Sequence, residues 1–191
     1  MSKSVKILLC FTLMSLMLLI LLCGYASVIY VNSVRTQSIP HLISGHSEKQ
    51  TVLNDLYLEK TTHTLSNKEY KHLIETELNL KLYSYQVKEL PNDNGKCNLY
   101  FRIIRINTGL SGVHYARTFT HEAMHLKHCT ENELFVCYET FKFLYKSDNK
   151  YLHNAGVIYA IDNLTHNVAE EYNITNQIMY YFLIEKGANN V

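Results

Sequence analysis

Breakers of regular structure are scarce in this chain of 191 residues, which holds only 2 prolines and 7 glycines. Such scarcity favours long, uninterrupted helices. Apolar residues make up 47% of the sequence, which is enough for a core, and the length allows one modest domain. The formal net charge of +1 gives no global electrostatic reason to expect nucleic acid as a partner. The composition therefore predicts one mainly helical domain that binds no nucleic acid.

The N-terminal region carries no charged residue from Ile7 to Val34. About 20 apolar residues suffice to cross the hydrocarbon core of a bilayer, and this run exceeds the usual hydrophobic region of a signal peptide. Lys3 and Lys6 precede the run and Arg35 follows it, which weakly favours a cytoplasmic N-terminus. The run predicts a single-pass membrane protein with its domain on the extracytoplasmic side.

This interpretation divides the chain into four parts. Residues 1–6 form a cytoplasmic N-terminus, 7–31 a transmembrane or signal-anchor helix, 32–65 a stalk and 66–191 the folded domain. The alternative is cleavage near Ala26, which would release the domain as a secreted protein.

In the folded part, one helix and two strands are expected first, and the remaining segments are expected to be helices. Ser66 and Glu69 form a capping box, which predicts a helix from there to about Leu80. Strands are expected at Lys81–Leu90 and Asn98–Asn107, joined as a small β-hairpin through a turn at Asn94-Gly95. Helices are expected after them, at about 114–128, 131–146, 151–163 and 165–186. The pattern predicts an α+β domain that is mostly helical.

The most informative motif is the HExxH run His121-Glu122-Ala123-Met124-His125. On a helix, residues four apart share a face, so both histidines can direct a ring nitrogen at one metal ion. Glu122 can then reach a water molecule without binding the metal, as a general base requires. The motif predicts a Zn²⁺ site with His121 and His125 as ligands and Glu122 as the catalytic residue.

A catalytic zinc ion needs a third protein ligand and an open position. Glu133 is the preferred choice because Leu126–Thr130 can make the turn that brings it back to the histidines. Glu131 is the alternative, either as a ligand or as an acceptor that orients a histidine. His128 is expected to cap the helix or face solvent. The sequence has no CxxC, which disfavours a zinc site built from cysteines alone.

Several weaker candidates accompany the motif. The segment Tyr100–Ile106 is either an edge strand that pairs with a peptide substrate or a core strand. Four side chains are candidates to stabilise a developing oxyanion, and each is also compatible with a structural role. They are Tyr115, Tyr138, His153 and His166.

The run His121–His128, the pair Glu131 and Glu133, and the segment Ser147–Leu152 with Gly156 after it resemble the DUF3810-type bacterial membrane proteins. The likeness covers about residues 110–165. The resemblance implies a zincin-like fold and a gluzincin-like site, with the glutamate ligand at Glu131 or Glu133. The chain differs from that family in having one predicted N-terminal span where the family usually has several.

Together these observations predict a membrane-anchored zinc metallopeptidase that hydrolyses peptide bonds in a peptide or protein substrate. The alternative is a non-catalytic, membrane-tethered binding protein with a vestigial or structural metal site. A third hypothesis is a helical protein without a metal, in which the HExxH motif is accidental.

Overall fold

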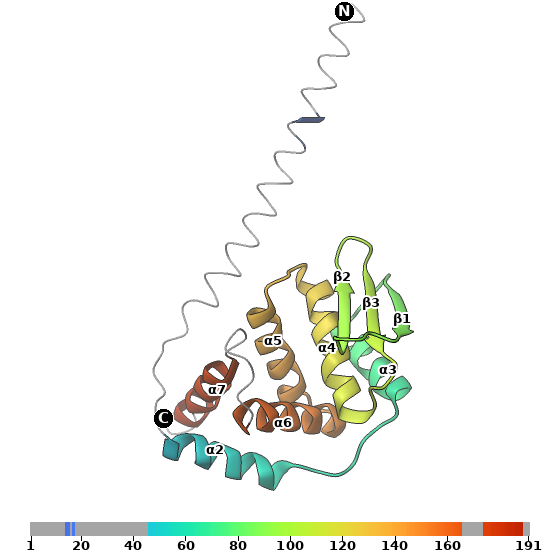
Figure 1. The fold of residues 1–191 in the computed structure, drawn as a ribbon. Helices are drawn as coiled ribbons and strands as arrows, with labels where there is room; N and C mark the ends of the chain where they lie inside the picture. The colour runs from blue at the N-terminus through green and yellow to red at the C-terminus, as the bar shows by residue number, and fades with distance from the viewer. Residues whose placement is uncertain (1–13, 16, 18–45, 166–173, 189–191) are drawn as a thin grey trace, which may run out of the picture. The chain divides into compact units, whose positions relative to one another are not determined.

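The computed structural model describes residues 14–15, 17, 46–165 and 174–188 (Figure 1). The helices and strands treated below all belong to one compact unit, Ile39–Val191. In chain order they are α2 (His46–Glu59), α3 (Asn67–Leu78), β1 (Ser84–Lys88), β2 (Gly95–Asn98), β3 (Ile103–Asn107), α4 (Gly112–His128), α5 (Glu133–Lys146), α6 (Lys150–Thr165) and α7 (Ile174–Ala188). The α+β class and the mainly helical content are confirmed.

The three strands form one small sheet in the order β1-β3-β2. β3 is the central strand, where Ile104 and Ile106 alternate with more exposed neighbours and are both fully buried. Their side chains join a core cluster with Tyr70 and Ile74 of α3 and Phe119 of α4. The sheet therefore gives α4 a fixed apolar support, and β2 lies at the sheet edge beside that helix.

The predicted pairing of the strands is wrong. β1 runs parallel to β3, with Ser84 opposite Ile103, and the hairpin forms instead between β2 and β3, with Gly95 opposite Ile106. Asn94-Gly95 does not form a hairpin turn, because Gly95 is already the first residue of β2. In the loop before it, the Asn107 side-chain amide donates hydrogen bonds to the carbonyl oxygens of Leu90 and Asp93, at 2.8 and 3.0 Å. These bonds fold the preceding loop onto the end of β3 and let Gly95 start a strand.

Two helices begin at residues whose side chains cap the first turn. The capping box is confirmed, because Ser66 accepts a hydrogen bond from the Glu69 amide and the Glu69 carboxylate accepts one from the Ser66 amide. Asn132 caps α5 by accepting a hydrogen bond from the Phe135 amide at 3.0 Å. Of the predicted helix over 165–186, the structure describes Thr165, the last residue of α6, and α7 from Ile174, whereas 166–173 lie outside the described residues.

A second core cluster joins α2, α6 and α7. Val52, Leu53 and Leu56 of α2 are buried there against residues of α6 such as Leu164. α2 falls within 32–65, the segment predicted as a stalk, and it packs as part of the folded unit.

The prediction of a single-pass membrane protein is overturned by the helices that the structure describes, since none of them is long and apolar enough to cross a membrane. The longest, α4, has 17 residues, whereas a spanning helix needs about 20 that are mostly apolar. The predicted span at 7–31 lies outside the described residues except for Met14, Ser15 and Met17.

Candidate metal centre

α4 carries the HExxH motif on its buried face. Glu122 and His125 are only 7% and 6% exposed. The His121 and His125 ring centroids lie 4.8 Å apart, and their Nε2 atoms approach to 3.1 Å. The helical spacing thus directs both imidazoles at one point, as the sequence predicts.

The chain then reverses and returns Glu133 to the two histidines. α4 ends at His128 and is followed by its C-cap Cys129, which adopts a left-handed conformation with φ of 51°, and Asn132 is the N-cap of α5. Glu133 Oε2 lies 3.0 Å from His121 Nε2, and Oε1 lies 3.3 Å from His125 Nε2. Glu131 is exposed and lines a cavity without joining this contact. Of the two glutamates considered, the structure brings Glu133 to the histidines.

The spacing of these three donor groups fits a zinc ion. Ligands bonded at about 2.0–2.1 Å in a tetrahedron lie about 3.3 Å from one another. The two Nε2 atoms lie 3.1 Å apart, and each contacts a different oxygen of the Glu133 carboxylate, at 3.0 Å from His121 and 3.3 Å from His125, so the groups lie close to that spacing. Cys137 offers a wider set with His121 and Glu133, in which one donor atom of each lies within 4.8 Å of the others. The set completed by His125 is the tighter of the two, and we base the site on it.

The charges of the cluster are strongly coupled. Burial acts to lower the pKa of His121, but hydrogen bonds to Cys137 and Glu133 outweigh it and raise the pKa to about 10. Hydrogen bonds from His121 and His125 lower the pKa of Glu133 to about 2. Without metal, Glu133 is therefore ionised and pairs with a protonated His121, and a metal ion would have to displace that proton.

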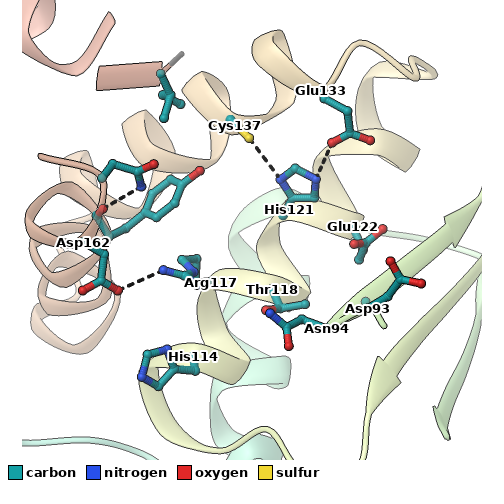
Figure 2. A pocket seen from close by; sticks show the side chains of 14 residues that line it. Asp93, Asn94, His114, Arg117, Thr118, His121, Glu122, Glu133, Cys137 and Asp162 are labelled. Carbon is teal, nitrogen blue, oxygen red and sulfur yellow. Dashed lines mark hydrogen bonds and ion pairs between the residues drawn. The ribbon is translucent and has the colours of Figure 1, made fainter. Parts of the chain in front are cut away.

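Glu122 lies beside the cluster and faces a cavity. Burial raises its pKa, and the nearby histidines only partly oppose that effect. A cavity of about 670 Å³ lies on one side, lined by Glu122, His121 and Glu133 among others (Figure 2). A second cavity of about 420 Å³ shares Asp93, Gly95, Glu122 and Glu133 with the first. Glu122 is thus reachable from both cavities.

The larger cavity is also lined by side chains that no sequence motif singled out. Arg117 of α4 forms an ion pair with Asp162 of α6 at 3.0 Å, and its guanidinium lies 5.4 Å from the Tyr159 ring centroid (Figure 2). His114 and Arg117 precede His121 by seven and four positions. This spacing puts them on the face of α4 that carries the motif, a signal that could have identified them. Tyr159 and Asp162 lie on α6, so no helical spacing in the sequence relates them to the motif.

The weaker candidates lie elsewhere. Tyr115 shares a hydrogen bond of 2.9 Å with the Tyr85 hydroxyl, and His153 contacts the Tyr145 carbonyl through Nδ1 at 2.6 Å. Neither of these residues nor Tyr138 lines the two cavities that flank the site. His166 lies outside the described residues.

Two further predictions concern the surroundings of the motif. His128 packs edge-on against Phe135, with ring centroids 5.1 Å apart. The segment predicted as a possible edge strand, Tyr100–Ile106, contributes the central strand β3, so the strand beside the site is β2.

No family model, no curated protein and no solved structure matches this chain. The resemblance to DUF3810-type proteins therefore stays a prediction.

Proposed function

We propose that this chain is a zinc-dependent peptidase in which His121, His125 and Glu133 hold the metal and Glu122 is the general base. The observation that carries the proposal is the convergence of three donor groups at 3.0–3.3 Å beside a buried carboxylate. Two histidines and a glutamate, with a fourth position left to water or substrate, are a donor set of catalytic zinc sites.

Zinc bound there would act as a Lewis acid and lower the pKa of a water molecule. The protein's own groups supply the rest. Glu122 accepts the proton of the attacking water and passes it to the leaving amine. Burial raises the pKa of Glu122, which brings it closer to the neutral range where one group can both take and give a proton.

The backbone fixes the orientation of His125. Its Nδ1 lies 2.7 Å from the Thr130 carbonyl oxygen, which can only accept a hydrogen bond. Nδ1 therefore carries a proton, and Nε2 is the nitrogen left to bind a metal ion. This is the tautomer that a metal ligand requires.

The two cavities suit a peptide better than a small compact molecule. They meet at Asp93, Gly95, Glu122 and Glu133, so a substrate can extend on both sides of the general base. A bond in the interior of an extended chain can reach Glu122 in such an arrangement.

The test uses the full-length chain and two matched variants, Glu122→Gln and His121→Ala. We expect about one zinc per chain by elemental analysis, retained in Glu122→Gln and lost in His121→Ala. Hydrolysis of a mixture of quenched fluorescent peptides should fall by about 10²–10⁴-fold in Glu122→Gln. A chain that takes up no zinc at neutral pH would refute the proposal.

A non-catalytic metal-binding protein is the second candidate, and the position of Cys137 favours it. A thiolate near His121 and Glu133 could close the coordination sphere, as in structural zinc sites. Zinc binding without peptide hydrolysis in the unsubstituted chain would support this second function.

A further inference from the structure

We propose that Cys137 is a positioning residue, which holds the His121 imidazole so that Nε2 faces His125 and Glu133. This inference rests on the proposed zinc site and adds the group that orients its first histidine. It assigns Cys137 a role through His121, without contact to metal or substrate.

The geometry places His121 between two side chains of one helix. Glu133 and Cys137 lie four residues apart on α5, so they share a face of that helix. Glu133 contacts Nε2 of His121 at 3.0 Å, and Cys137 Sγ lies 3.8 Å from Nδ1 on the other side of the ring (Figure 2). α5 therefore contacts both nitrogens of the same imidazole.

A histidine that binds a metal through Nε2 must carry its proton on Nδ1. That N–H needs an acceptor, because the acceptor fixes both the tautomer and the rotation of the ring. For His125 the acceptor is the Thr130 carbonyl, whereas for His121 the atom in that position is the Cys137 sulfur. The two ligands thus have partners of different chemistry, one on the backbone and one on a side chain that can be substituted.

The sulfur is itself held in place from α6. Burial, and after it the proximity of Cys137, raise the pKa of the Tyr159 hydroxyl, and Tyr159 is only 7% exposed, so its hydroxyl lies close to the Cys137 sulfur. The Arg117 guanidinium packs over the Tyr159 ring and forms an ion pair with Asp162. A chain of contacts therefore runs from α6 through Tyr159 and Cys137 to His121, and it limits the rotation of the Cys137 side chain.

The test compares zinc dissociation constants of the full-length chain, measured by competition with a chelator. The variants are Cys137→Ala, Cys137→Ser and the control Cys129→Ser, which replaces an exposed thiol that lines neither cavity. We expect Cys137→Ala to weaken zinc binding by about 10–100-fold. Cys137→Ser should recover part of the loss, since its hydroxyl can accept from Nδ1. Cys129→Ser should match the unsubstituted chain.

Thermal unfolding of the metal-free proteins separates orientation from folding. The inference requires Cys137→Ala and the unsubstituted chain to unfold at similar temperatures while their zinc affinities differ, with Cys137→Ser binding zinc more tightly than Cys137→Ala. Equal affinities in Cys137→Ala, Cys137→Ser and the unsubstituted chain would overturn the inference and leave the proposed function intact. An unsubstituted chain that binds no zinc would overturn both.

Substitution with Co²⁺ distinguishes positioning from direct ligation. A thiolate bonded to cobalt gives a strong charge-transfer band in the near ultraviolet. We expect no such band in the unsubstituted chain, and its presence there and loss in Cys137→Ala would make Cys137 a ligand and overturn the inference.

Discussion

Gly95, the first residue of β2, lies directly against the side chain of Glu122. A Cβ atom added to Gly95 would lie 2.8 Å from Glu122 Oε1 and 2.7 Å from Thr118 Cγ2. Real Cβ contacts are essentially never this short, so any side chain at position 95 must displace the carboxylate or the strand. The sheet edge therefore sets the position of the proposed general base.

The first prediction follows from that contact. Gly95→Ala should lower peptide hydrolysis by about 100-fold, because a displacement of the base by about 1 Å is enough for such a loss. Zinc content should not change, since none of the three proposed ligands contacts Gly95 so closely. The control is Gly109→Ala, whose added Cβ would meet only Asn107 Oδ1, at an ordinary 3.9 Å. Equal activity in Gly95→Ala and Gly109→Ala would contradict this prediction.

The second prediction separates the two candidate glutamates. Glu133→Ala should weaken zinc binding by about 100-fold or more, because it removes a group that contacts both histidines. Glu131→Ala should leave zinc binding within about twofold, as expected for an exposed carboxylate outside the cluster. Elemental analysis after dialysis against a weak chelator measures both. Loss of zinc in Glu131→Ala alone would reverse the assignment.

The third prediction concerns pH. In the metal-free protein the pKa of His121 is raised from 6.5 to about 10, so this residue stabilises the fold below pH 6.5 and loses that effect as pH rises toward 10. Zinc needs the neutral ring, so its binding should release about one proton per ion in this window, and affinity should rise with pH. Calorimetry in two buffers of different ionisation enthalpy counts the proton. A heat of binding that is the same in both buffers would rule this out.

The fourth prediction tests the packing of α5 on α6. A Cβ on Gly156 would come within 2.6 Å of Tyr145 Cα, and backbone cannot move aside as a flexible side chain can. Gly156→Ala should therefore destabilise the protein by about 1–3 kcal/mol, the usual cost of overpacking. Urea unfolding gives this value, with Gly109→Ala again as the control. If the two variants had the same midpoint, the close approach of the helices would be in doubt.

The local features of the fold were predictable because they depend on neighbouring residues. The Ser66–Glu69 capping box and the helical phase of His121 and His125 need only a short window of sequence. The strand pairing was not predictable in this way, since Asn94-Gly95 has the composition of a hairpin turn. Here the glycine is required by its contact with Glu122, which is distant in sequence, and that tertiary constraint overrides the local turn preference.

The same limit applies to the candidate site. Glu133 could be chosen from sequence because a short turn connects it to His125. Cys137 shares the α5 face with Glu133, yet only the structure shows that it contacts His121 Nδ1. Tyr159 and Asp162 come from α6, and no pattern in the sequence relates that helix to the motif. Their contribution depends on how α6 packs against α4.

The proposed ligands and the group that orients His121 all lie between positions 121 and 137, on two successive helices joined by a short loop. Closing so short a segment costs little chain entropy, so these groups can meet early in folding, before the distant α2 and α7 are in place. A helix pair of this kind is nearly self-contained. It could be grafted onto an unrelated scaffold with its donor geometry intact, provided that the scaffold supplied a strand with a glycine to face the carboxylate and a side chain in the place of Tyr159.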